Sequence, residues 1–197
     1  MTELHWMPAY ELAAMIRGRE LKPSELMAAT IARIERLNPQ LNAFCAMRSD
    51  LAMDEARAMD ERIARDKEVG PLAGLPLGVK DLEGVAGMPT TFGSVPFKNN
   101  LAQEDSIEVA RLRAAGAIVV GKTNTPEFGH TAFTRNLLFG VSRNPWNPDR
   151  TPGGSSGGSS AAVASGMVPL ATASDWGARS EYPHATPAPS VSNPRRD

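Results

Sequence analysis

A helix pattern followed at once by a strand pattern, in residues 105–123, restricts the fold of this chain most strongly. In "DSIEVARLRAAGAIVVGKT", Asp105 or Ser106 can cap a helix that Gly116 ends. The β-branched run "AIVVGKT" is typical of a buried, parallel strand. A helix feeding directly into such a strand predicts an α/β architecture. The residues expected to face inward from the helix are Ile107, Ala110, Leu112 and Ala114.

Two further helices are predicted in the first seventy residues. In "KPSELMAATIARIERLNP", Ser24 stands where an N-cap belongs and Pro39 is expected to end the helix. In "SDLAMDEARAMDERIARDK", Ser49 or Asp50 can act as the cap. The apolar stripes, which we interpret as core packing, are Leu26, Met27, Ala29, Ile31, Ile34 and Leu37 in the first helix and Leu51, Met53, Ala56, Met59 and Ile63 in the second.

Glycine and proline residues of the kind that form turns become frequent near residue 71. "GPLAGLPLGVKDL" predicts a short strand approached by turns. Further on, "TPGGSSGGSS" at residues 151–160 precedes an Ala-rich helical pattern, "SSAAVASGMV", and a strand pattern, "VPLATAS". The Gly/Ser block therefore lies between ordered elements, and no domain boundary is evident within residues 1–175.

Composition excludes several classes of protein. The chain has 197 residues, 42% hydrophobic and 22% charged, as expected of one globular domain or most of one. A formal charge of −1 gives no electrostatic reason to bind nucleic acid or an anionic membrane. The single cysteine, Cys45, is interpreted as a buried small hydrophobe and fits a reducing compartment. With no signal-like or membrane-spanning run, a cytoplasmic location is expected.

Three interpretations of the Gly/Ser block compete. A flexible linker is the simplest, but the flanking helix and strand argue against it. A phosphate-binding loop lacks the Gly-Lys-Ser/Thr sequence and the dinucleotide fingerprint. In a catalytic loop, a serine needs a base, and none of the three histidines has an obvious triad context. Lys80, after the strand-like run, is either a surface lysine or a base desolvated enough to be neutral.

The strings "GLPLGVKDL", "GKTNTPEFG" and "NPWNPDRTPGGSSGGSSAAVASGMVPLATASD", in this order and spacing, closely resemble the amidase signature family over residues 5–175. The resemblance implies the N-terminal part of an α/β fold with a mixed central sheet covered by helices. It also implies a Ser–Ser–Lys triad that hydrolyses a carboxylic amide. Lys80 aligns with the general base and Ser155 with the bridging serine, next to an unusual cis peptide.

The sequence departs from the family where the nucleophile is expected. The family carries Asp-x-Gly-Gly-Ser, but this chain reads "SDWGARSEYP", with Arg179 where the serine should stand and Ser180 one residue late. Ser180 is thus a displaced candidate nucleophile, and weak or absent activity is expected because misplacement of about 1 Å can cost ~100-fold in rate. The backbone N–H groups of Trp176, Gly177 and Ala178 align with the oxyanion and substrate loop.

Residues 176–197 form a Pro-rich tail that resembles nothing in the family, and we expect it to be disordered. We interpret it as a frame error. Tyr182 to Thr186 can be encoded so that reading one base later gives Ile-Arg-Met-Pro, which resembles the family sequence. The alternative is a genuine divergent C-terminus, and the nucleotide sequence across codons 170–200 distinguishes them.

Three functions are consistent with the resemblance. The first is an amidase acting on a small-molecule amide, without metal or organic cofactor and without direct nucleic-acid or membrane binding, that can form a homodimer. The second is the glutaminase-type component of a tRNA-dependent amidotransferase, which needs partner proteins. The third is a non-catalytic remnant that associates through its helical N-terminus.

Overall fold

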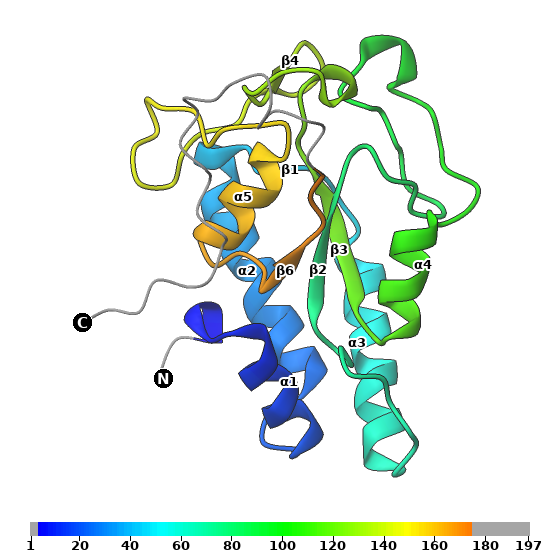
Figure 1. The fold of residues 1–197 in the computed structure, drawn as a ribbon. Coiled ribbons are helices and arrows are strands. Elements are labelled where there is room, and N and C mark those ends of the chain that lie inside the picture. Colours follow the sequence, from blue (N-terminus) through cyan, green and yellow to red (C-terminus); the bar gives the residue numbers. More distant parts are fainter. Residues whose placement is uncertain (1–3, 175–197) are drawn as a thin grey trace.

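The computed structural model describes residues 4–174 and contains a mixed sheet with helices on both faces (Figure 1). The strands of this sheet stand in the order β1-β3-β2-β6, with β3 and β6 parallel to β2 and β1 antiparallel to β3. They are β1 (Phe44–Met47), β2 (Pro76–Lys80), β3 (Ile118–Thr123) and β6 (Leu170–Ala171); a separate two-stranded ladder joins β4 (Arg135–Asn136) and β5 (Gly140–Val141). The predicted α/β class with a mixed sheet is confirmed.

The helices are α1 (Ala9–Arg17), α2 (Pro23–Leu41), α3 (Ser49–Ala64), α4 (Ile107–Ala114) and α5 (Gly157–Ala164), with short 3-10 turns η1 (Leu4–Trp6), η2 (Val95–Phe97) and η3 (Glu127–Gly129). In Figure 1, α2 and α5 lie on one side of the strands and α4 on the other. Within the described residues, no helix is both long and apolar enough to cross a membrane.

Side chains alternate between the two faces of the sheet along the central strands, and this alternation determines which helices each residue contacts. Leu77 and Val79 of β2 pack with Val109 of α4. On the opposite face, Ile118 and Val120 of β3 pack with residues of α2 and α5. Because successive side chains of a strand point to opposite faces, the last residue of β2, Lys80, belongs to the α5 face. The sheet thus directs this lysine toward the Gly/Ser block.

The first long helix differs from its prediction at both ends. Its N-cap is Lys22, whose backbone N–H donates to Glu25 Oε2 at 3.2 Å, and Pro23 occupies the first helical position. Ser24 is therefore inside the helix, because proline at the first turn loses no helical hydrogen bond. Pro39 also lies inside, and the helix ends only at Asn42, which adopts a left-handed conformation.

The inward face of helix α3 differs from the predicted stripe at its first residue. The helix buries Ala52, Ala56 and Met59, whereas Leu51 is exposed. Leu51 precedes Ala52 by one position, and neighbouring residues of a helix point about 100° apart. The prediction was therefore wrong for Leu51 and right for the two residues Ala56 and Met59.

Helix α4 begins after the Ser106 cap, as expected, but its inward face is rotated from the prediction. The buried residue is Val109, and Leu112 packs partly buried against the same cluster. Ile107, Ala110 and Ala114 are exposed, so these three predictions were wrong. Residues two apart on a helix point about 200° apart, and burial of Val109 therefore turns Ile107 outward.

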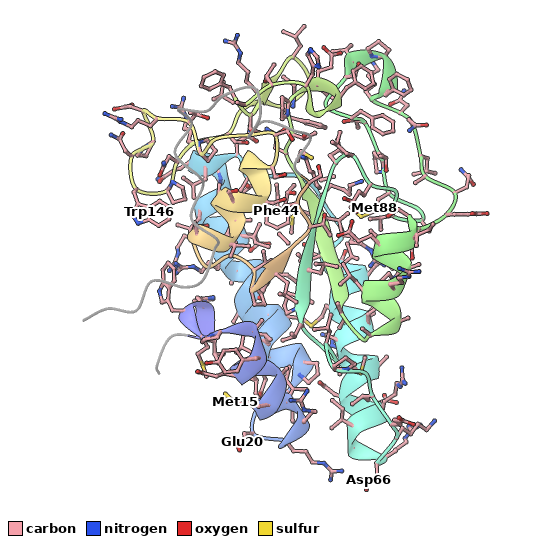
Figure 2. The ribbon with its side chains drawn as sticks, in the orientation of Figure 1. Met15, Glu20, Phe44, Asp66, Met88 and Trp146 are labelled. Atoms are coloured by element: carbon pink, nitrogen blue, oxygen red, sulfur yellow. The ribbon has the colours of Figure 1, made fainter. Side chains whose placement is uncertain are left out.

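Strand β1 was not predicted, because its "FCAM" pattern is short and lies between two helices. Its Phe44 reaches the interior, whereas Trp146 lies at the periphery (Figure 2) and is exposed. The strand is fixed by its pairing with β3, which is a non-local interaction.

Candidate active site

Lys80, the last residue of β2, is fully buried with 0% of its surface exposed. Its backbone N–H donates to Thr172 Oγ1 at 2.8 Å, which joins the end of β2 to the segment following β6. Burial of an amine disfavours its charged form unless polar groups compensate. The surface interpretation of this lysine is therefore wrong.

The Gly/Ser block packs tightly against the end of β3. A Cβ atom added to Gly158 would lie 2.4 Å from the backbone N of Asn124, and one added to Gly157 would lie 2.3 Å from Thr134 Oγ1. Glycine at both positions allows this close approach of backbones. The peptide between Gly154 and Ser155 is cis, as the resemblance implied. The block is an ordered loop rather than a flexible linker.

Three serine hydroxyls surround the Lys80 amine. Lys80 Nζ forms hydrogen bonds with Ser155 Oγ at 2.8 Å, with Ser156 Oγ at 2.9 Å and with Ser174 Oγ at 2.8 Å. The predicted contact between Lys80 and Ser155 is thus present. An amine held by several hydroxyls within hydrogen-bond distance can exchange protons with them.

Ser156 and Ser174 were missed by the sequence analysis. Ser156 is adjacent to Ser155 in the same block, which was a usable signal. Ser174 comes from a separate segment beyond β6 and meets Lys80 only through the parallel pairing of β6 with β2. No local pattern could have assigned it.

A buried chain of hydroxyl groups lies beside this cluster. Ser159 Oγ donates to the carbonyl of Thr172 at 2.7 Å and lies 2.6 Å from Thr123 Oγ1. All three residues are buried. Because they come from α5, β3 and the segment after β6, these bonds hold together the elements that carry Lys80 and the serines.

The opposite side of the β2 end holds a buried ion pair. Lys122 Nζ lies 3.4 Å from Asp81 Oδ1, with both side chains 1% exposed, and also donates to Thr90 Oγ1 at 3.1 Å. Burial lowers the pKa of Lys122, and the charge of Asp81 opposes this effect. Burial raises the pKa of the Cys45 thiol well above its ordinary value, which fits an unreactive packing role.

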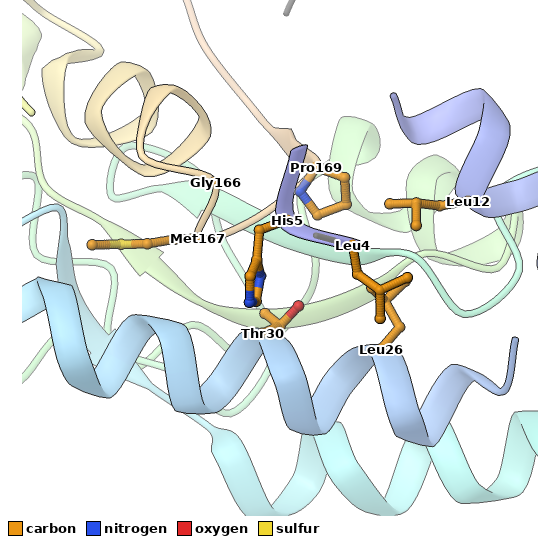
Figure 3. A pocket seen from close by; sticks show the side chains of 8 residues that line it. All are labelled: Leu4, His5, Leu12, Leu26, Thr30, Gly166, Met167 and Pro169. Atoms are coloured by element: carbon orange, nitrogen blue, oxygen red, sulfur yellow. The ribbon is translucent and has the colours of Figure 1, made fainter. Parts of the chain in front are cut away.

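Two cavities lie away from the serine cluster. The one in Figure 3, between η1, α2 and Gly166, has a volume of about 10 Å³ and holds at most one water molecule. The second, of about 120 Å³, is lined by Cys45, Ala46, Asp81, Pro89, Thr91, Lys98, Leu138 and Phe139. Neither is lined by Lys80 or by the three serines.

The remaining predicted site residues, Trp176, Gly177, Ala178 and Ser180, lie outside the described residues, as do Arg179 and the tail 176–197. Within residues 4–174, no group of three or more His, Cys, Asp or Glu side chains could hold a metal ion.

Comparison with known proteins agrees with the geometry. The Amidase family profile matches residues 25–179. The chain is 42% identical to an acylamidase from Rhodococcus erythropolis over 94% of this chain and 39% of the relative. It is 44% identical to the A component of a glutamyl-tRNA(Gln) amidotransferase from Acidothermus cellulolyticus over 94% of this chain and 37% of the relative.

Among solved structures, a bacterial aryl acylamidase of the amidase signature enzymes superposes with a TM-score of 0.80 at 36% identity. The match covers 84% of this chain and 34% of that one. This chain spans about two-fifths of the length of these curated relatives. With most of its length matched by the family profile and its sheet superposing on a solved member, the chain belongs to the amidase signature family.

Proposed function

We propose that this chain hydrolyses a carboxylic amide with Lys80 as the base and Ser155 as the bridging hydroxyl. The observation that carries the proposal is the 2.8 Å contact between the Ser155 hydroxyl and a fully buried amine. A serine is a poor nucleophile until a base removes its proton, and lysine replaces histidine in some serine hydrolases. Family membership supplies the reaction class.

The proposed reaction is an acyl transfer in two steps. A serine attacks the amide carbonyl, the amine leaves with a proton returned by the lysine, and water then hydrolyses the acyl-enzyme. The oxyanion donors in this proposal are the backbone N–H groups of Trp176, Gly177 and Ala178, by alignment with the family. Low turnover is expected, since Arg179 stands at the aligned nucleophile position and Ser180 is displaced by one residue.

The direct test replaces Lys80 by methionine, which keeps the length of the side chain and removes the amine. With a chromogenic anilide as substrate, we expect the Lys80→Met variant to lose at least ~100-fold in hydrolysis rate, the usual contribution of an acid–base group. Lys67→Met, at an exposed lysine, is the matched control and should retain the wild-type rate. Equal rates in both variants, or no hydrolysis by the wild-type chain, would contradict the proposal.

A second candidate function is favoured by the 44% identity to the A component of an amidotransferase. In that case glutamine is the amide and companion proteins are required. Ammonia release from glutamine that depends on added B and C components would favour this candidate over an independent amidase. The third candidate, a non-catalytic remnant, predicts no covalent labelling by an active-site serine probe.

A further inference from the structure

We propose that Ser174 is the nucleophile of this chain and that Lys80 activates it directly. This inference rests on the proposed hydrolase function and deepens it. Ser174 Oγ lies 2.8 Å from Lys80 Nζ, so base and nucleophile are in direct contact, and the Ser155 hydroxyl bridges Lys80 and the leaving amine instead. Ser174 is also exposed, whereas Ser155 and Ser156 are partly buried. The position that aligns with the family nucleophile holds Arg179, which has no hydroxyl.

Ser156 is excluded as the nucleophile by its hydrogen bonds. A hydroxyl has one proton and two acceptor lone pairs. Ser156 Oγ donates to the carbonyl of Ser174 at 3.1 Å and accepts from the N–H of Ser174 at 3.1 Å and from Lys80. Its proton therefore points to a carbonyl instead of the amine. These reciprocal bonds fix the backbone of Ser174, which makes Ser156 a positioning residue.

Ser155 is less accessible to a substrate. A Cβ atom added to Gly129 would lie 3.7 Å from both Cβ and Oγ of Ser155, so the backbone of η3 lies against this serine. Its carbonyl accepts from Thr125 Oγ1 at 3.2 Å, which holds the residue to the segment after β3. Ser155 is thus suited to carrying protons, while Ser174 is placed to meet a carbonyl.

The hydrogen bonds between the serines and Lys80 are consistent with an uncharged lysine amine. A neutral amine has two N–H donors and one lone pair, so Lys80 can donate to serine oxygens and can also accept a proton from a serine hydroxyl. The Ser156 proton is already directed to the Ser174 carbonyl, which leaves Ser155 and Ser174 as the hydroxyls that can donate to the amine. Of these two, Ser174 is the exposed one. Its proton can therefore pass to Lys80 as its oxygen meets a substrate.

The chemical step balances without a further reactant. The Ser174 proton moves to Lys80 Nζ as Oγ bonds to the amide carbon, and the carbonyl π electrons move to oxygen. The oxyanion collapses, the C–N bond breaks, and the proton on Lys80 reaches the departing amine through the Ser155 hydroxyl. Water then hydrolyses the ester on Ser174 to release the acid and restore the hydroxyl.

The test is covalent labelling of the full 197-residue chain by a fluorophosphonate, followed by peptide mapping of the labelled serine by mass spectrometry. We expect the adduct on Ser174, and at least ~100-fold slower labelling in Ser174→Ala. Ser160→Ala, on helix α5, is the control and should label at the wild-type rate. Mapping is done on the wild-type chain, so it does not depend on the folding of any variant.

The other outcomes separate the two proposals. An adduct on Ser180, Ser155 or Ser156 would overturn the assignment of Ser174 while leaving the hydrolase function intact. No adduct on the wild-type chain would overturn both. Ser174→Ala removes one of the three hydroxyls that hydrogen-bond the buried amine of Lys80, so a lower thermal unfolding midpoint is expected in that variant, and the mapping on the wild-type chain decides the assignment.

Discussion

At the scale of single residues, the chemistry depends on charged and polar groups that the fold removes from water. Lys80 and the Lys122–Asp81 pair are all buried at the end of β2, on its two sides. Such groups are retained only where hydrogen bonds or opposite charges compensate for lost hydration. The serine cluster does this for Lys80, and Asp81 does it for Lys122.

Breaking the ion pair should destabilise the chain strongly. In Asp81→Asn, Lys122 loses its charged neighbour at 3.4 Å in a site where both side chains are only 1% exposed. We expect the free energy of unfolding to fall by about 3–5 kcal/mol, as is usual when one partner of a buried pair is removed. Urea denaturation measures it, and Asp54→Asn, in an exposed pair with Arg57, is the control. A loss as small as that of the control would contradict a buried pair.

Glu83 provides a pH-dependent test. Burial, followed by the neighbouring carboxyl of Glu108, raises the pKa of Glu83 to about 7, against opposing effects of Lys122 and Lys80. The folded chain then holds a proton that the unfolded chain releases near pH 4.5, so stability falls as the pH rises from about 4.5 to 7.

In Glu83→Gln this contribution disappears, because the side chain is neutral at every pH. Over that pH range the wild-type chain should lose about 1 kcal/mol more stability than the variant, a value reduced for screening by water at a partly exposed residue. Urea denaturation at several pH values measures the difference. Glu68→Gln, at an exposed position, should follow the wild-type curve. Parallel curves for Glu83→Gln and wild type would rule this effect out.

At the scale of elements, the sequence predicted the parts whose signal is local. The buried β2 and β3, the helices around residues 23–64 and the helix after the Gly/Ser block follow from periodicity, although the N-caps of the two long helices are Lys22 and Arg48 and not the predicted residues. Two of the misses depend on non-local packing. Strand β1 exists through its pairing with β3, and the helix continues past Pro39 to Leu41, which is anchored in the core.

The candidate site shows the same division. The resemblance to a known family identified Lys80 and Ser155, and the structure brings them together. Ser174 depends on a two-residue strand, β6, whose pairing with β2 no local pattern could set. Ser156 could have been predicted as a site residue because it follows Ser155 directly in the Gly/Ser block. Its role, however, is visible only from its hydrogen bonds to the backbone of Ser174.

The close packing of helix α5 against the end of strand β3 can be tested by a substitution at Gly158. In Gly158→Ala, the new methyl group would lie 2.4 Å from the backbone N and 2.5 Å from the carbonyl O of Asn124, so the start of α5 must move away. We expect a loss of about 1–3 kcal/mol in stability and slower fluorophosphonate labelling, because Ser155 and Ser156 move with the helix. The control is Ser160→Ala in the same helix. Unchanged labelling in a folded Gly158→Ala would refute the packing argument.

At the scale of the whole molecule, three distant segments supply one cluster. Lys80 comes from the second strand, Ser155 and Ser156 from the loop before α5, and Ser174 from the segment after β6. The sheet brings these segments to one edge, where the carboxyl ends of its parallel strands meet. This arrangement, held within about two-fifths of the length of the curated relatives, is what the proposed acyl transfer requires.

The charge on Lys80 decides whether the proposed acyl transfer can begin. Nitrogen NMR of the chain labelled with ¹⁵N-lysine reports whether each Nζ is an amine or an ammonium, and Lys80→Met assigns the signal. At pH 8 we expect the Lys80 signal to be that of an uncharged amine coupled to serine hydroxyl protons. An ammonium signal like that of the exposed Lys67 would contradict the mechanism, because a charged lysine cannot accept the proton of an attacking serine.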